Sequence, residues 1–431
     1  MLKYILLALI PVHLLVAMAI VAQSRNTTLP NSMKLAEVRV VGSQRFESSE
    51  AVAALGLKRG EEVTENALKQ AADRLASTGM FSDITYSYIS GPQGTRVEYR
   101  VADTEKLLPA SFDNFVWLSR AELLKELRRR EPLFRDAIPN AGEMYERLAD
   151  DIKGVLDDLH VSATVKVLPQ VPQTGGEVVG FTYWVVGVKL PIRKVEFPGA
   201  STEMNALLQK AAGNSLLGSD YSASRVRTIA TLDFVPQYRM RGFLRAAFGD
   251  PLGELQEQAT GAVALSLPIN EGKQYQLASV QWSGNSVFSA GELTKFLKTQ
   301  FNKPANQVQL EEDLSAISKV YGTRGYLEAR LKPSFGFDDD RQTVTADVEV
   351  QEGDQYHMGS VKFEGLSENA TTSLQKLWKL RSGDVYDSSY PTLFITGAGH
   401  AFDLSALRIQ MSQQVHHESK AVDVAFRFAP K

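Results

Sequence analysis

The sequence predicts the α+β fold class, in the form of an elongated tandem array of five β-α-α-β-β modules. Two recurring patterns support this prediction: a short strand that ends in glycine, and a helix that is followed by glycine and an aromatic residue. The third observation is the length, because 431 residues are too many for one module and correspond to several domains.

The stretch 274–356 contains the complete pattern in its clearest form. An alternating strand, Ala278–Trp282, ends in a Ser-Gly-Asn turn, and a first helix with apolar residues at 293, 296 and 297 follows. A second helix places apolar residues at 310, 314, 317 and 321 on one stripe, the spacing of an amphipathic helix. It stops at the glycines 322 and 325. Two strands, Tyr326–Leu331 and Thr343–Val350, complete the module around a polar turn at 338–341.

The opening strand recurs along the chain with its closing glycine. Gly199, Gly284 and Gly365 follow one another at intervals of 85 and 81 residues, and Gly42 stands 157 residues before Gly199, about two intervals. A module without the glycine is therefore expected to begin near residue 115. Repetition at a fixed period indicates tandem modules rather than one large domain.

The end of the second helix recurs as well. Gly79, Gly242 and Gly325 each follow a helix pattern. An aromatic residue comes directly after Gly242 and Gly325, and after one intervening methionine in the case of Gly79. Glycine adopts the positive φ that ends a helix without steric cost, so we interpret these three residues as structural turns.

The repeats divide the sequence into six segments. Residues 1–22 precede the array, and the five modules are expected at 34–103, 104–188, 189–272, 273–353 and 354–431. The second module is irregular, with helices expected at 120–130 and 143–159. The fifth is degenerate, because Pro391, Gly397 and Gly399 make 390–402 a poor helix.

Residues 1–22 have the features of a signal for export. Lys3 precedes an almost wholly apolar run, and Ala17-Met18-Ala19 offers a cleavage site of the A-x-A type. The run is also near the lower limit for crossing a bilayer, so an uncleaved anchor is the alternative. In either case we expect the modules to be exported.

The sequence offers little for catalysis or for cofactor binding. There is no cysteine, the net charge is −3, and none of the six histidines has the His-Glu-x-x-His spacing of a zinc site. Asp338, Asp339 and Asp340 lack the spacing of a calcium loop, so we expect a solvated turn there. We predict no enzyme, no metal or cofactor site, and no nucleic-acid partner.

A small sheet can instead bind another chain at its edge, where backbone N–H and C=O groups have no partner. The candidates on the opening strands and on the hairpin edges are Val38, Val40, Val195, Val280, Val361, Ala329 and Leu331. Charge on the edge, or a neighbouring segment, could equally block such pairing.

These patterns resemble the POTRA repeat (polypeptide-transport-associated domain), in which a glycine-ended strand, two helices, a Gly-aromatic exit and two strands follow one another. The motif Glu-Gly-x-x-Tyr at 271–275 and 352–356 is similar to the family's linker. Five such repeats resemble the periplasmic region of the BamA-like outer-membrane assembly factors, without the C-terminal barrel. The chain ends directly after the fifth module, so we expect either a relative made of POTRA repeats alone or a fragment or split gene.

The resemblance implies a scaffold or chaperone in the periplasm or at the outer membrane, acting in outer-membrane protein assembly or export. The partners it implies are a barrel protein or unfolded barrel clients, together with other envelope assembly proteins. Membrane contact would be limited to the N-terminal segment or to the partners. The alternative is an inner-membrane-anchored POTRA scaffold of an envelope or division machine.

Overall fold

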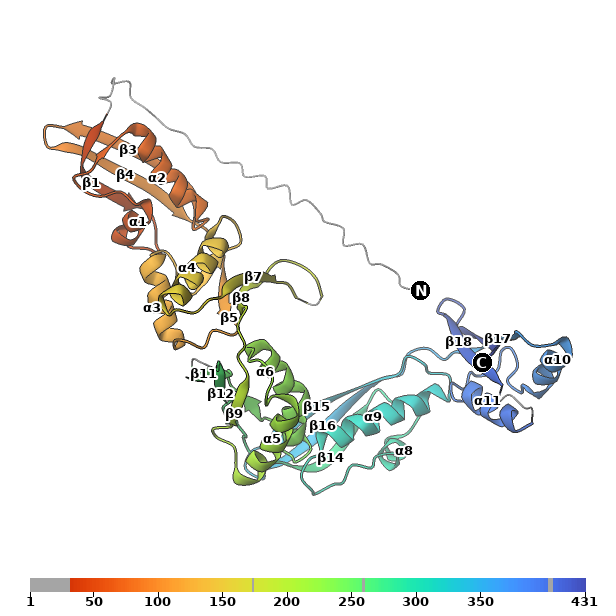
Figure 1. Ribbon diagram of the computed structural model, residues 1–431. Coiled ribbons are helices and arrows are strands. Elements are labelled where there is room, and N and C mark those ends of the chain that lie inside the picture. The colour runs from red at the N-terminus through yellow and green to blue at the C-terminus, as the bar shows by residue number, and fades with distance from the viewer. Residues whose placement is uncertain (1–31, 173, 258–259, 402–405) are drawn as a thin grey trace. The chain divides into compact units, whose positions relative to one another are not determined.

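The computed structural model describes residues 32–172, 174–257, 260–401 and 406–431, and Figure 1 shows its helices and strands. The export signal predicted at residues 1–22 lies outside the described residues. No helix among the described residues is both long and apolar enough to cross a membrane.

The first two modules contain two helices and four strands each. The first comprises β1 (Met33–Val41), α1 (Ser48–Leu55), β2 (Glu62–Val63), α2 (Glu65–Ser77), β3 (Phe81–Gly91) and β4 (Gly94–Asp103). The second comprises β5 (Leu107–Phe112), α3 (Arg120–Arg130), β6 (Ala137–Pro139), α4 (Met144–Asp158), β7 (Thr164–Gln170) and β8 (Gly180–Val186). The strand orders are β2-β1-β4-β3 and β6-β5-β8-β7.

The third module has a less regular second helix. Its elements are β9 (Ile192–Glu196), α5 (Thr202–Ser215), α6 (Ala223–Ile229), the π-helical η1 (Ala230–Phe234), α7 (Val235–Arg239), β10 (Ala247–Phe248), β11 (Leu252–Glu257), β12 (Ala262–Ser266) and β13 (Ile269–Asn270). Pro236 has no backbone N–H to donate to the helical hydrogen-bond pattern, and the π-helical turn ends two residues before it. A proline of this kind displaces the preceding turn and accounts for the irregularity.

The fourth and fifth modules have the predicted β-α-α-β-β order. The fourth comprises β14 (Gln276–Ser283), α8 (Ala290–Lys295), α9 (Gln307–Gly322), β15 (Arg330–Asp338) and β16 (Thr343–Gln351). The fifth comprises β17 (His357–Glu364), α10 (Glu368–Leu377), α11 (Tyr390–Ala401), β18 (Leu407–His416) and β19 (Ala421–Pro430). The sheet orders are β14-β16-β15 and β17-β19-β18, so the last strand is central in each.

The sequence pattern of the fourth module explains its local structure. Ser289 and Glu292 form a capping box at the start of α8, and Asn306 accepts a hydrogen bond from the Gln309 N–H at the start of α9. The predicted apolar stripe of α9 is buried against the sheet, together with alternate residues of β16. The α+β fold class and the amphipathic helix are thereby confirmed.

Two predicted segments differ from the structure. The strand expected at Tyr326–Leu331 begins at Arg330 instead, because Tyr326 and Ala329 belong to a turn in which the Ala329 N–H donates to the Tyr326 carbonyl at 3.4 Å. The segment expected to be a poor helix is helical as α11. Pro391 lies in its first turn, where a missing N–H costs nothing, and Phe394 and Ala398 pack one turn apart into the core.

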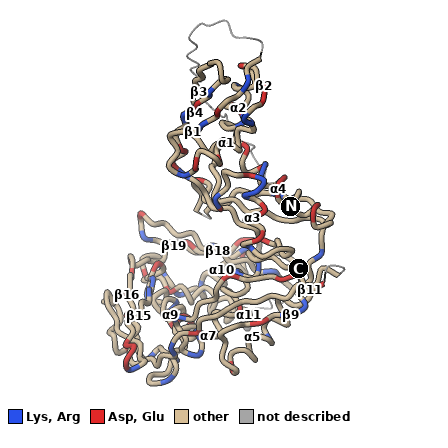
Figure 2. The backbone as a smooth tube through the Cα atoms, turned by 90° about the vertical axis from the view of Figure 1, so that its left-hand side faces the viewer, with Lys and Arg blue, Asp and Glu red and all other residues tan. Residues whose placement is uncertain are grey.

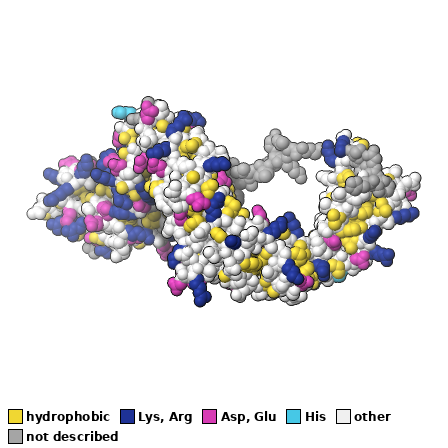
Figure 3. All heavy atoms as spheres, turned by 90° about the horizontal axis from the view of Figure 1, so that it is seen from below, with side chains coloured by type: hydrophobic (Ala, Val, Ile, Leu, Met, Phe, Trp, Pro, Cys, Tyr) yellow, Lys and Arg dark blue, Asp and Glu magenta, His cyan; other side chains and the backbone are white. Residues whose placement is uncertain are grey.

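The contacts divide the chain into two compact units. Of the described residues, the first contains those up to 194 and those within 216–225 and 252–265, and the second contains those within 195–215, 226–251 and 266–431. The division passes through the third module. Acidic and basic residues are interspersed along the chain in Figure 2, and charged and hydrophobic side chains are interspersed on the face in Figure 3. This agrees with the small net charge.

Candidate functional site: strand edges and module junctions

The predicted opening-strand valines occupy equivalent positions in their sheets. Val38 lies opposite Val97 of β4, Val280 opposite Ala346 of β16, and Val361 opposite Val424 of β19, always with the last strand of the module. β9, β14 and β17 are edge strands. In the first module β2 pairs only with Met33 and Lys34, so Val38 and Val40 lie on an uncovered part of β1.

The beginning of each opening strand is not free. The loop after the first helix covers it, because Leu35 exchanges backbone hydrogen bonds with residues 60 and 61. The equivalent pairs in the third, fourth and fifth modules are Ile192 with 218–219, Leu277 with 302–303, and Met358 with 383–384. Only the later part of each strand, which includes the predicted valines, remains as a candidate edge.

Two of the predicted edge positions already have partners. The Val40 N–H donates to Ser48 Oγ at 3.0 Å, and the Val195 carbonyl accepts a hydrogen bond from Gln209 Nε2 at 2.9 Å. The Val40 bond also shows which residues of β1 direct their N–H and C=O groups away from the sheet, because alternate residues of a strand direct these groups to the same side. Val38 therefore directs its N–H and C=O outward, as Val40 does.

A groove of about 940 Å³ runs beside this part of β1. Val38 lies on one wall, Val52 and Leu57 lie on the helix side, and Ile89 lies on the hairpin side. The Ile89 side chain is 78% exposed and pairs with Arg96 on the face of the sheet away from the helices, so the apolar contacts beside β1 come from Val52 and Leu57. The groove combines an outward-facing backbone edge with apolar side chains, which is what an extended peptide requires.

The two predicted hairpin-edge residues have different environments. Leu331 lies on β15, at the outer edge of its sheet and opposite Val350. Ala329 precedes β15, is buried, and its carbonyl accepts a hydrogen bond from Ser318 Oγ at 2.8 Å. Its assignment to a strand edge is therefore wrong, because the turn after Gly325 continues through this residue.

Gly242 and Gly325 lie at contacts between consecutive modules. The Gly242 carbonyl accepts a hydrogen bond from the Tyr275 N–H at 2.9 Å, and the Gly325 carbonyl accepts one from the Tyr356 N–H at 2.8 Å. Both tyrosines close a Glu-Gly-x-x-Tyr motif, so the two sequence motifs meet in space. Leu244 and Leu327, two residues after each glycine, pack against the core of the following module.

Gly79 also lies at a contact between consecutive modules, but its neighbours differ from those of Gly242 and Gly325. Its φ is +71°, and a Cβ there would lie 2.0 Å from the Ala141 carbonyl oxygen of the second module. Its own carbonyl accepts a hydrogen bond from Thr104 Oγ1 at 2.6 Å. The sequence indicated only the turn, since the neighbour that requires glycine is distant in sequence.

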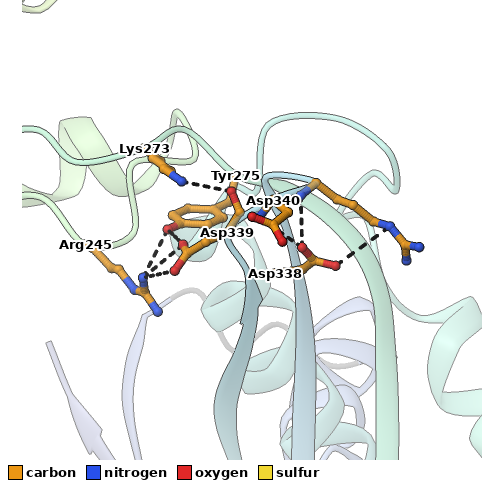
Figure 4. Close-up of polar contacts among 7 residues, drawn as sticks. Arg245, Lys273, Tyr275, Asp338, Asp339 and Asp340 are labelled. Carbon is orange, nitrogen blue, oxygen red and sulfur yellow. Dashed lines mark hydrogen bonds and ion pairs between the residues drawn. The ribbon is translucent and has the colours of Figure 1, made fainter.

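The contact between the third and fourth modules is reinforced by side chains (Figure 4). Tyr275 Oη donates to Asp339 Oδ1 at 2.5 Å, and Arg245 Nη1 lies 3.1 Å from the same oxygen. The guanidinium of Arg245 also lies 4.0 Å from the ring centre of Phe337. The hydrogen bond from Tyr275, with a smaller contribution from Arg245, lowers the pKa of the Asp339 carboxyl.

The aspartate turn is therefore only partly the solvated turn that we expected. Asp338 Oδ1 accepts hydrogen bonds from the backbone N–H groups of Asp340 and Arg341, while Asp339 faces the preceding module. No group of three or more acidic or histidine residues within the described ranges is arranged to hold a metal ion. A single sequence gives no signal for the Arg245–Asp339 contact, because the two residues are far apart along the chain.

The same arrangement recurs between the fourth and fifth modules with other side chains. Glu328 takes the place of Arg245, three residues after the glycine, and His417 takes the place of Asp339 at the hairpin tip. Tyr356 Oη lies 2.8 Å from His417 Nδ1, and that nitrogen lies 3.3 Å from Glu328 Oε1. Each junction thus contains a tyrosine hydroxyl that contacts a side chain at the hairpin tip, with a third polar side chain beside them.

We expect Arg245 and Asp339 to be favourably coupled in a double-mutant cycle with alanine. Both side chains are about half exposed, which limits the ion pair, and the contact with Phe337 adds a cation–π contribution. Urea unfolding of the full chain gives the coupling. The matched control is Arg341–Asp338, whose charged atoms are 3.9 Å apart on a more exposed surface, with an expected coupling near zero. Equal coupling in both pairs would contradict the interpretation.

Comparison with known proteins gives consistent similarities. Residues 275–353 match the family POTRA, described as "Surface antigen variable number repeat". An outer membrane protein assembly factor of Treponema pallidum (strain Nichols) is 32% identical over 135 residues, which cover 29% of this chain and 16% of that protein. The outer membrane protein assembly factor BamA of Neisseria meningitidis serogroup B is 23% identical over 259 residues, which cover 56% of this chain and 32% of that protein.

Among solved structures, POTRA3-5 of Haemophilus influenzae BamA aligns with a TM-score of 0.42 and 20% identity, covering 55% of this chain and 95% of that one. The chain spans less than half the length of the curated relatives that it matches, namely 16%, 32% and 45%. The fourth module is therefore a POTRA repeat, and the chain is similar in sequence to the outer membrane protein assembly factors.

Proposed function

We propose that this protein is an exported POTRA scaffold that acts in outer-membrane protein assembly, in the periplasm or at the outer membrane. Its modules bind extended segments of client or partner proteins by strand addition. The similarity to outer membrane protein assembly factors supports the process. The observation that supports the binding mode is the groove beside the uncovered part of β1.

The groove favours an extended chain for two reasons. Val38 directs its backbone N–H and C=O outward, and an added strand would satisfy both of them. An added strand also directs alternate side chains to the helix face, where Val52 and Leu57 provide apolar contacts. Backbone pairing demands little of the client's sequence, which suits a scaffold that binds many barrel proteins.

We expect a photoreactive residue at position 59, which is exposed and lines the groove beside β1, to crosslink to an unfolded outer-membrane barrel protein diluted from urea. The matched control is a photoreactive residue at Lys69, which is exposed on α2 of the same module. Val38→Pro removes the outward N–H without touching the ladder to β4 and is expected to reduce crosslinking at least fivefold, whereas Val38→Thr keeps the N–H and should retain it.

Equal crosslinking at positions 69 and 59, or equal crosslinking by the proline and threonine variants, would overturn strand addition in this groove. Circular dichroism tests whether the proline variant remains folded. If it does not, the position-59 result and a peptide competitor with methylated amides carry the test.

A further inference from the structure

A cavity of about 570 Å³ lies where the third module meets the fourth. Arg241, which follows α7, lines it from the side of the third module. Lys298 and Lys303, on the loop between α8 and α9, line it from the fourth. Glu203 is the single acidic residue of its lining. Three positive charges against one negative give the lining a net charge of +2, although the chain as a whole carries −3.

These three cations have no carboxylate partner. Among the residues that the structure describes, none of the three forms an ion pair, and neither does Glu203. Arg241 Nη1 donates instead to the Gln237 carbonyl at 2.8 Å. Like charges that line one cavity repel each other, so an anion between them is stabilised.

Position 303 can be compared across four modules through one backbone hydrogen bond, in which the loop carbonyl accepts from an N–H of the opening strand. The accepting residues are Glu61, Ser219, Lys303 and Asp384, at distances of 2.8, 2.9, 3.0 and 2.8 Å. The fold thus accepts an acidic residue or a serine at this position. Of these four modules, the fourth alone carries a basic residue here. The positive charge of Lys303 is therefore not a requirement of the fold, which points to a ligand.

The loop that carries the two lysines is held in place at both ends. Asp313 Oδ2 accepts hydrogen bonds from the Lys298 N–H at 2.8 Å, the Thr299 N–H at 2.8 Å and Thr299 Oγ1 at 2.7 Å. Asp313 is 3% exposed. At the other end, the Lys303 carbonyl is bonded to the opening strand. Both lysines thus extend from a fixed backbone, so little conformational entropy is lost when a ligand binds.

We propose that this cavity binds a phosphate group, either of a small soluble phosphate ester or of a lipid headgroup. Lysine and arginine are the usual side-chain ligands of phosphate, and a net charge of +2 in the lining matches a phosphate dianion. Asn306 adds a neutral donor to the lining, because its oxygen accepts the Gln309 N–H at 2.9 Å and its NH₂ group remains for a ligand. Since Arg241 belongs to the third module and the lysines belong to the fourth, a bound phosphate bridges the two modules.

Isothermal titration calorimetry of the full chain with glycerol 3-phosphate at low salt tests the proposal. We expect one binding site, with an affinity that falls as sodium chloride is added. Lys303→Asp introduces the residue that the fifth module has at this position and is expected to weaken binding about tenfold. Lys332→Asp is the matched control, because it makes the same change of charge at an exposed residue of the fourth module outside the cavity, and it should leave the affinity unchanged.

Lys298→Gln is a second variant, which keeps the test valid if Lys303→Asp does not fold. It removes one charge from the cavity and retains the backbone N–H that donates to Asp313, so it should also weaken binding. Equal binding by the wild type and both variants would overturn the proposal. An equal loss of binding in Lys303→Asp and Lys332→Asp would do the same.

Phosphatidylcholine vesicles with and without phosphatidic acid distinguish the two sources of phosphate. Binding of glycerol 3-phosphate supports a soluble ester. Sedimentation with phosphatidic acid vesicles alone, lost in Lys303→Asp, supports a lipid headgroup, and binding of neither probe overturns the proposal. A short capped polyglutamate peptide that binds more tightly than the ester would assign the cavity to an acidic polypeptide and would overturn it as well. None of these results depends on the groove beside β1, so strand addition there is tested separately.

Discussion

Replacing Gly325 with alanine is expected to lower the free energy of unfolding of the fourth and fifth modules by roughly 2–4 kcal/mol. Two costs combine at this position. The residue has a φ of +83°, which an L residue adopts only with strain, and a Cβ there would lie 2.6 Å from the Tyr356 carbonyl oxygen. That oxygen belongs to the backbone, so the next module must move to relieve the clash.

Gly383 provides the matched control. Its φ is +89°, close to that of Gly325, but a Cβ there has no described atom within 4 Å. Gly383→Ala should therefore show only the conformational cost, about 1 kcal/mol. Urea unfolding of both variants, followed by the tryptophan fluorescence of Trp282 and Trp378, measures the difference. Equal destabilisation would mean that close approach between the modules contributes nothing.

Replacing Glu352 with alanine is expected to cost about 3 kcal/mol, because one carboxylate oxygen accepts three hydrogen bonds. The donors to Glu352 Oε1 are the backbone N–H of Ser286 at 2.8 Å, the N–H of Val287 at 2.9 Å, and Tyr321 Oη at 3.0 Å. Tyr321 is completely buried, so its hydroxyl has no access to water as a substitute partner. Burial and then the hydrogen bond with Glu352 raise the pKa of Tyr321, which keeps the hydroxyl protonated.

Glu352→Gln retains an oxygen acceptor and should cost less than half as much as the alanine variant in the same denaturant experiment. Tyr321→Phe removes one donor and leaves the two N–H groups satisfied, so its cost should be about 1 kcal/mol. Equal effects of the alanine and glutamine variants would show that the three hydrogen bonds do not carry the stability of this turn.

The third module contains the same network, which explains why Glu-Gly recurs. Glu271 Oε1 accepts a hydrogen bond from Tyr238 Oη at 2.9 Å and one from the Ser201 N–H at 2.8 Å. In both modules the glutamate joins the end of the last strand, the second helix and the turn after the opening strand. The next residue, Gly272 or Gly353, takes a positive φ and begins the linker to the following module.

Local patterns in the sequence were sufficient to predict the fold class and most of the helices. The glycine-ended strands, the amphipathic stripe of α9 and the helix-ending glycines depend on residues within one or two turns of each other, so a single sequence displays them. The prediction failed where packing outweighs local preference, as in α11, whose glycines are tolerated because Phe394 and Ala398 enter the core.

Only the tertiary structure decided which backbone groups face outward and what lies beside each glycine. The sheet order places the last strand in the centre, so β15 and β18 become edges. Gly325 looks like an ordinary helix end in the sequence. The structure adds the Tyr356 carbonyl beside it, a contact between modules that no local pattern encodes. Edges and junctions arise from pairings between residues distant in the sequence, and a single sequence does not show which distant residues will pair.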